Sequence, residues 1–112
     1  MLVSQLKSKI HRAMVTRGDV EYEGSIEIPQ DLMEAARLWP GEKVLVASVT
    51  TGNRFETYAL VGPPGTGQII VNGGAAHLVK AGERVVIMSF ALDDNPIVPT
   101  KIVCNEVNEI IS

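Results

Sequence analysis

Side chains that can bind anions, transfer protons or act as nucleophiles lie in five short groups spread along the chain. The groups are Lys9 with His11, Tyr22, Gly24 with Ser25, Arg54 with Thr57 and Tyr58, and Asn72 with Gly73. Taken singly, most have an ordinary structural explanation, because an arginine on a strand is usually solvated and a tyrosine is often half buried. Gly24 and Ser25 are unusual, since they fall within a regularly alternating stretch in which glycine has no structural use.

The glycine-rich segment from Gly62 to Ile69 invites comparison with a phosphate-binding loop. In such a loop a lysine and a hydroxyl side chain hold the γ-phosphate and Mg²⁺. Here Gln68 and Ile69 stand at these two positions, and the residues that follow have the character of a strand instead of a helix. The sequence therefore favours a rigid connection between two strands over nucleotide hydrolysis.

Metal coordination and disulfide formation are both disfavoured by the distribution of soft ligands. His11, His77 and Cys104 are the only histidine and cysteine residues, and none is part of a paired ligand spacing. We therefore expect no metal site. A single cysteine also excludes a disulfide within the chain, which fits a reducing compartment.

Strands must position most of these side chains. Residues 19–28 alternate strictly between the two faces of a strand, and we expect them to form a hairpin with residues 9–17 that reverses near Gly18. Asp31 can cap a short helix that Pro40 and Gly41 end. Further strands are predicted over residues 43–49, 54–61, 68–72, 84–92 and 100–107.

An internal repeat organises these elements. Residues 35–44 resemble residues 75–85, and each copy contains a short helical turn, a Gly-Glu turn, a basic residue and an apolar strand. A spacing of about 40 residues in so short a chain indicates two interlocked halves of one barrel, because a solenoid would need more copies to bury its faces. We therefore predict a mainly β fold, a six-stranded double-psi β-barrel with short helices.

Length and composition agree with one small β-rich domain over residues 1–112. Valine and isoleucine supply 24 of the 112 residues, whereas aromatic residues make up only 4%. Branched aliphatic side chains favour pleated sheets, so the core must be aliphatic. The net charge of −3 disfavours nucleic acid and anionic membranes as partners. No apolar run is long enough for a transmembrane helix or a signal peptide, so we expect a soluble cytoplasmic domain.

Four motifs taken together resemble one family. They are Lys9-Ile10-His11-Arg12, Tyr22-Glu23-Gly24-Ser25, Arg54-Phe55-Glu56-Thr57-Tyr58-Ala59 and Asn72-Gly73-Gly74-Ala75-Ala76-His77. In this order and spacing the sequence is similar to the pyruvoyl-dependent aspartate 1-decarboxylases, from Met1 to about Phe90. The double-psi barrel of that family agrees with the repeat, which does not depend on the resemblance.

The resemblance implies that the chain makes its own electron sink. Decarboxylation of an amino acid leaves carbanion character at Cα, which no protein side chain absorbs alone. In the family, the hydroxyl corresponding to Ser25 attacks the carbonyl of Gly24, and the resulting ester eliminates and hydrolyses to a pyruvoyl group. The implied products are a β chain of residues 1–24 and an α chain of residues 25–112. Thr57 is the implied donor to the Gly24 oxygen.

The resemblance also implies how L-aspartate would be converted to β-alanine and CO₂ for pantothenate and coenzyme A biosynthesis. The pyruvoyl ketone would form a Schiff base with the substrate amine. Arg54 and Lys9 would bind the retained carboxylate, and Tyr58 would return a proton to Cα. The implied lining of the pocket consists of His11, Tyr22, Asn72, Gly73, Gly74 and Ala75.

Family members are homotetramers with active sites between adjacent subunits, so the resemblance implies that Lys9, Arg54 and Tyr58 act on the pyruvoyl group of a neighbour. An alternative is a non-catalytic double-psi barrel that serves as a binding module, with Ser25 an ordinary strand residue. A second alternative retains self-cleavage and changes the substrate, for example to glutamate.

Overall fold

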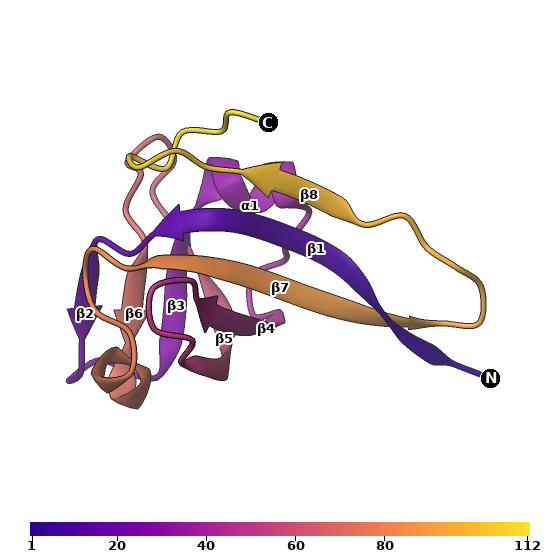
Figure 1. Ribbon diagram of the computed structural model, residues 1–112, viewed down its shortest axis with the longest axis horizontal. Helices are drawn as coiled ribbons and strands as arrows, with labels where there is room; N and C mark the ends of the chain where they lie inside the picture. The colour runs from indigo at the N-terminus through magenta and orange to yellow at the C-terminus, as the bar shows by residue number, and fades with distance from the viewer.

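The computed structural model describes residues 1–112 and consists mainly of β-strands (Figure 1). In chain order the elements are β1 (Val3–Met14), β2 (Arg17–Asp19), β3 (Ser25–Pro29), the α-helix α1 (Gln30–Ala36), β4 (Lys43–Ser48), β5 (Arg54–Gly62), β6 (Ile70–Asn72), the 3-10 helix η1 (Gly73–His77), β7 (Arg84–Asp93) and β8 (Thr100–Val103). The predicted mainly β fold with short helices is confirmed.

The strands form one sheet in the order β2-β6-β3-β5-β4-β7-β1-β8. Only Val15 and Thr16 separate β1 from β2, yet these two strands lie near opposite ends of that order, so the sheet must curl back on itself. Eight strands are present where the prediction has six. The short β2 and the outlying β8 are the two end strands, and the six strands between them match the predicted number.

The core is aliphatic, as the composition indicates. Its largest fully buried side chains come from strands on all sides of the barrel and from α1, and they include Ile10, Ile26, Ile28, Leu32, Met33, Val46 and Ile87. The aromatic side chains stay outside this set, and Phe55 is only partly buried against it. Burying these branched aliphatic side chains inside the curled sheet supplies most of the driving force for folding.

The internal repeat is reproduced in hydrogen bonds. In the first copy, the Trp39 N–H donates to the Glu42 carboxylate at 2.9 Å, and in the second the Lys80 N–H donates to the Glu83 carboxylate at 2.8 Å. The glycine before each glutamate has a left-handed backbone, with φ of +82° at Gly41 and +91° at Gly82. Each turn then feeds a strand, β4 or β7, and these two strands pair with each other in antiparallel fashion.

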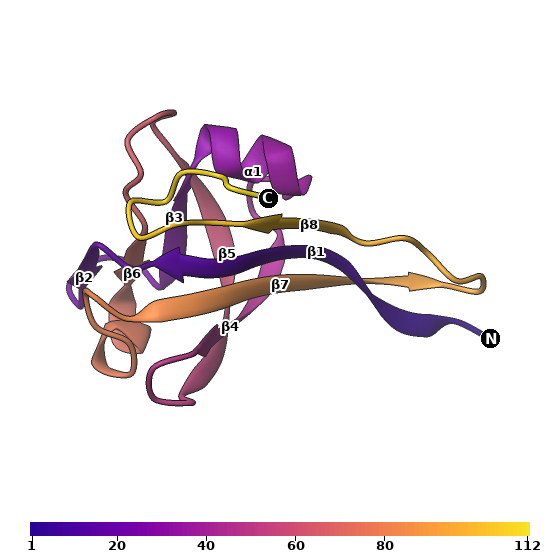
Figure 2. The ribbon, with the colours of Figure 1, turned by 45° about the horizontal axis from the view of Figure 1, so that its top comes forward.

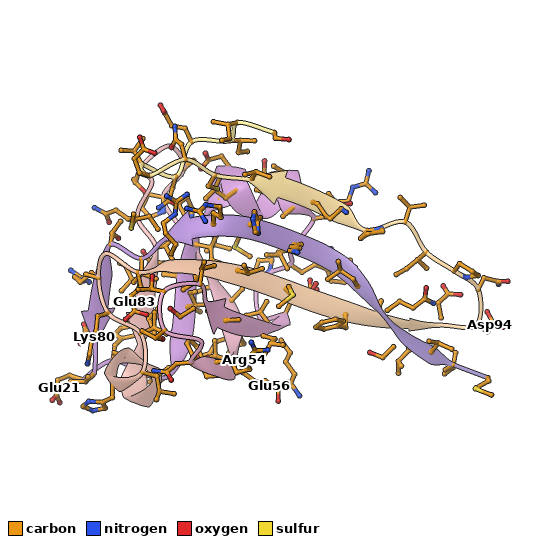
Figure 3. All side chains as sticks on the ribbon, viewed as in Figure 1. Glu21, Arg54, Glu56, Lys80, Glu83 and Asp94 are labelled. Carbon is orange, nitrogen blue, oxygen red and sulfur yellow. The ribbon has the colours of Figure 1, made fainter.

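A long two-stranded arm extends from the barrel. β1 and β7 run side by side as antiparallel neighbours and carry the N-terminal end of the chain away from the other strands (Figures 1 and 2). The arm exposes the large apolar side chains Leu2, Val3, Phe90 and Leu92. Figure 3 shows Asp94 at its tip. Exposed apolar side chains gathered on a protruding element are typical of a surface that meets another protein.

The predicted hairpin is wrong. β1 pairs with β7 and β8, whereas β3 pairs with β5 and β6. The expected strand over residues 19–28 is interrupted, because β2 ends at Asp19 and an exposed turn precedes β3. Val20 and Tyr22, which the alternation places on the same face as the buried Ile26 and Ile28, are 45% and 56% exposed. An alternating pattern needs a neighbouring strand to become a strand, and these residues have none.

Two local expectations also change. Asp31 does not cap α1, since the helix begins after Pro29 without a side-chain cap and Asp31 instead accepts a hydrogen bond from the Gly65 N–H at 2.9 Å. The segment that follows Gly62 is a loop leading into β6, as predicted, so it has no helix onto which a phosphate could dock. None of the helices has the length and apolar character that crossing a membrane requires.

Candidate active site

Ser25 is the first residue of β3 and is completely buried. Its hydroxyl donates a hydrogen bond to the Glu23 carbonyl at 3.1 Å and accepts one from the Asn72 side-chain amide at 3.0 Å. Asn72 is itself buried and lies directly opposite Ser25, because β3 and β6 are antiparallel neighbours in this register. The Ser25 hydroxyl is therefore held in one orientation at the junction between the preceding turn and the strand.

Gly24 lies in the exposed turn before β3 and not inside a strand. A Cβ atom added at Gly24 would meet nothing within 4 Å, and its φ lies outside the left-handed region. Neither packing nor backbone conformation therefore requires glycine here. What the missing Cβ does provide is an unhindered carbonyl carbon next to the Ser25 hydroxyl.

Gly73 packs against the backbone of the turn that contains Gly24. It follows Asn72, has a φ of +78°, and any Cβ there would lie 2.7 Å from the Cα and 2.9 Å from the N of Gly24. Only glycine permits both this backbone conformation and this approach. Gly74 and Ala75 continue η1, Gly74 exposed and Ala75 packed against the core. Asn72, Gly73, Gly24 and Ser25 thus form one contiguous group.

β5 brings Tyr58 next to this group. β3 and β5 are parallel, and their register places Ile26 opposite Ala59, both of them in the core. The preceding residue on each strand, Ser25 on β3 and Tyr58 on β5, therefore points to the other face, and the two are neighbours there. The Tyr58 side chain is 37% exposed, so its hydroxyl is accessible to a small molecule.

Arg54 and Thr57 both lie on β5, but their side chains are on opposite faces of the strand. Arg54 is an even number of residues from Tyr58 and so shares its face; Figure 3 shows it beside Glu56 at β5. Glu56 pairs with Lys43 at 3.3 Å, whereas Arg54 has no ion-pair partner in the chain. Thr57 is half buried on the opposite face, and its hydroxyl makes no hydrogen bond within the chain.

Lys9 and His11 lie elsewhere in the same chain. Both are on β1, between β7 and β8, and neither is hydrogen-bonded to the group around Ser25. Burial lowers the pKa of His11, and the positive charges of Lys9, Arg12 and Arg84 lower it further. Tyr22 is exposed on the turn before Gly24. The structure thus assembles two groups of the predicted site residues, one around Ser25 and one on β1.

The group on β1 has features that the sequence did not reveal. A cavity of about 380 Å³ adjoins Lys9 and His11, and Lys101 of β8 also lines it. Arg12 has a left-handed backbone, with φ of +62°, at an irregularity in the pairing of β1 with β7. Arg84 donates to the Arg12 carbonyl at 2.8 Å and thereby holds this bend. No short motif signals either feature, because both depend on which strands are neighbours.

No three histidine, cysteine, aspartate or glutamate side chains are grouped closely enough to hold a metal ion. Cys104 is buried, and burial raises the pKa of its thiol, which keeps it protonated and unreactive.

Comparison with known proteins identifies the family. Residues 1–111 match the family model described as aspartate decarboxylase. The chain is 50% identical over 111 residues to the aspartate 1-decarboxylase of Thermotoga petrophila, covering 99% of this chain and 97% of the relative. It is 43% identical over 114 residues to that of Phenylobacterium zucineum, covering 98% and 97% of the two chains. It is also 54% identical over 90 residues to that of Corynebacterium efficiens, covering 80% and 66%. The chain therefore belongs to the aspartate decarboxylase family.

Proposed function

We propose that this chain decarboxylates L-aspartate to β-alanine and CO₂, after it has cleaved itself between Gly24 and Ser25 to make a pyruvoyl group. The name shared by its full-length relatives supports the reaction. The observation that carries the self-cleavage is the buried Ser25 hydroxyl, oriented by Glu23 and Asn72 directly after a carbonyl that no Cβ shields.

The cleavage needs only groups of this chain and one water molecule. The Ser25 Oγ attacks the Gly24 carbonyl carbon, so that an ester replaces the peptide bond and the Ser25 nitrogen becomes an amine. Elimination of the ester releases Gly24 as the carboxylate end of residues 1–24 and leaves a dehydroalanine at position 25. Hydrolysis of that residue releases ammonia and leaves a ketone at the start of residues 25–112.

The surroundings of Ser25 favour this sequence of steps. The Asn72 amide and the Glu23 carbonyl restrict the hydroxyl to one orientation, which lowers the entropy cost of reaching the attacking geometry. The oxyanion that develops at Gly24 needs a hydrogen-bond donor. We assign this role to Thr57, whose hydroxyl has no other partner in the chain; it must turn towards Gly24 as the attack begins.

The remaining residues have roles in substrate binding and proton transfer. The pyruvoyl ketone supplies the electron sink that decarboxylation needs, and Asn72 with the backbone of Gly73, Gly74 and Ala75 borders it. Arg54 has a free guanidinium for the retained carboxylate, and Lys9 supplies a second cation. Tyr58 shares the face of Ser25 in its own chain, so we assign it the return of a proton to Cα there and not, as the resemblance implies, on a neighbouring subunit. His11 and Tyr22 complete the lining.

A homotetramer with active sites between subunits accounts for the separation of the two groups of site residues. Lys9 and His11 lie on β1, which does not pair with the strands that carry Ser25, Asn72 and Tyr58. A neighbouring subunit can bring its own β1 to that site, and the apolar arm offers a surface for such an assembly. We place this assembly in the cytoplasm, where the single reduced Cys104 is compatible with the redox conditions.

Mass spectrometry of the purified protein tests the self-cleavage. The 12.1 kDa chain should convert to fragments of residues 1–24 and 25–112, the larger one reactive towards a hydrazide that labels ketones. Ser25→Ala should remain a single chain without activity, whereas the matched change at an exposed serine, Ser4→Ala, should cleave normally. Cleavage of Ser25→Ala at the same bond would contradict the mechanism. A wild-type chain that stays intact after prolonged warming would favour the non-catalytic binding module.

The substrate is tested on the cleaved protein. Incubation with L-aspartate should yield β-alanine, and incubation with L-glutamate should yield little γ-aminobutyrate, because one extra methylene displaces the distal carboxylate from the cations that bind it. A higher kcat/KM with glutamate would assign the enzyme to the longer substrate and leave the self-cleavage mechanism intact.

A further inference from the structure

Lys101 lies directly opposite Lys9 in the sheet. β1 and β8 are parallel, and their register pairs Lys9 with Lys101 and His11 with Val103. The Cys104 N–H donates to the His11 carbonyl at 3.0 Å and continues this register beyond β8. Residues paired in this way carry their side chains on the same face of the sheet. The two lysines are therefore neighbours although they come from opposite ends of the chain.

Both lysines line the cavity of about 380 Å³ beside β1. Its other lining residues are His11, Ile102, Val103 and Ser112, and no aspartate or glutamate side chain is among them. The two ion pairs of the chain join Lys7 to Glu42 and Lys43 to Glu56, so neither Lys9 nor Lys101 has a side-chain counterion. The Nδ1 atom of His11 is buried without a hydrogen-bond partner. The cavity thus carries two ammonium groups, and the only negative group on its lining is the α-carboxylate of Ser112, which forms no ion pair with either lysine.

Placing Lys9 opposite Lys101 lowers the stability of the fold unless an anion binds between the two side chains. Like charges directly opposite each other on neighbouring strands repel, and an acidic residue at either position would remove the cost. A concave surface on which positive charge exceeds negative charge, as two ammonium groups exceed the one α-carboxylate here, raises the local concentration of small anions. Two ammonium groups on adjacent strands can contact the two oxygens of one carboxylate, each as a point charge. The chemistry therefore fits a small carboxylate.

We propose that Lys101 is a substrate-binding residue, which together with Lys9 binds the retained carboxylate of a dicarboxylic amino acid held on the pyruvoyl group of a neighbouring subunit. This inference rests on the proposed function, since it needs the site to be shared between subunits. It adds to the specificity of the site a cation from β8, a strand that carries none of the four motifs. Lys101 binds substrate and takes no part in the cleavage at Ser25.

Steady-state kinetics of Lys101→Gln test the proposal. The variant should cleave at the wild-type rate and show a KM for aspartate raised about three- to tenfold with kcat within about twofold, because Lys101 is exposed and its contact with a carboxylate is partly screened. Lys101→Arg should restore most of the affinity. The control is Arg17→Gln, which removes the same charge from an exposed position outside the cavity and should leave KM unchanged.

A binding measurement distinguishes a site for the substrate carboxylate from a site for free inorganic anions. Calorimetry with succinate, a dicarboxylate without an amine, is carried out on Ser25→Ala, which has no pyruvoyl group. Adding Lys101→Gln should weaken succinate binding by the same factor as the KM change. If Lys101→Gln weakens the binding of inorganic phosphate but not that of succinate, the cavity is a site for free anions and the proposal is wrong.

Two further outcomes would also overturn it. Equal KM values for Lys101→Gln and Arg17→Gln would show that only net charge matters, and a lower kcat with unchanged KM would exclude a role in binding the substrate. These results differ from a failure of the proposed function, in which the wild-type chain itself neither cleaves nor forms β-alanine. In that case, succinate binding to Ser25→Ala still reports whether Lys101 contributes to a carboxylate site.

Discussion

Replacing Gly73 by alanine should slow self-cleavage although residue 73 provides no reacting atom. Its φ is +78°, and the new Cβ would lie 2.7 Å from the Gly24 Cα, 2.9 Å from the Gly24 N and 3.3 Å from the Tyr22 carbonyl oxygen. All three contacts are with backbone atoms of the turn that carries the scissile bond, so no side chain can rotate away. Either Gly73 changes its conformation or the turn moves.

Two free-energy costs of the Gly73→Ala substitution set the size of the expected effect on cleavage. A left-handed conformation costs a residue with a Cβ about 1–2 kcal/mol, and forcing an extra methyl into a packed contact costs about 1–3 kcal/mol. The sum is about 2–5 kcal/mol. If about 1.4 kcal/mol of this sum raises the barrier to attack on Gly24, the cleavage rate falls about tenfold. We therefore expect cleavage of Gly73→Ala to be at least about tenfold slower than that of the wild type.

The assay follows the intact 12.1 kDa chain and the two fragments by mass spectrometry at a fixed temperature. Gly74→Ala is the matched control, because a Cβ at position 74 meets nothing within 4 Å and its φ is not left-handed. That variant should cleave at the wild-type rate. If Gly73→Ala cleaves as fast as Gly74→Ala, even with a lower thermal midpoint, the placement of the turn does not control cleavage.

Two further predictions concern turnover and acid stability. Tyr58→Phe should cleave normally and lose about 10²- to 10⁴-fold in kcat, since it keeps the ring and removes the proton donor; near-wild-type kcat would exclude Tyr58 from that role. Partial burial opposes ionisation of Glu42, but hydrogen bonds from the Trp39 N–H and from Lys7, together with the Lys7 charge, outweigh it, so the pKa of Glu42 lies below its usual 4.5. A lowered carboxyl pKa stabilises the fold above pH 4.5 and the gain is lost as the pH falls through the folded-state pKa. Lys7→Met should therefore lower the free energy of urea unfolding at pH 7 and have little effect near pH 3. An equal loss at both pH values would show that packing of the Lys7 stem is responsible.

Much of the fold can be read from local pattern. The strands β4, β5 and β7 agree with the predicted segments to within one residue at each end. The Gly-Glu repeat predicts two equivalent turns, and Gly41 with Glu42 and Gly82 with Glu83 form them with matching hydrogen bonds. Such features depend on contacts between residues close in sequence, and turn chemistry and side-chain period determine them.

The segment before Ser25 could not be predicted in this way. Residues 19–28 have the period of a strand, yet the first half of the segment forms an exposed turn supported by Gly73 of η1. The reason for Gly24 also changes. Its Cβ position is open, so the glycine that seemed out of place in a strand is compatible with the structure and is explained by the chemistry at its carbonyl.

The sequence by itself determined which chemical groups this protein has, the faces of most of its strands and its membership of one family. The tertiary structure alone decided which of these groups meet. The Asn72 amide reaches Ser25 across 47 residues, Lys101 lies beside Lys9, and β1 stays apart from the strands around Ser25. A two-residue period specifies the face on which a side chain lies, whereas the neighbour of each strand depends on how the whole sheet curls around its aliphatic core.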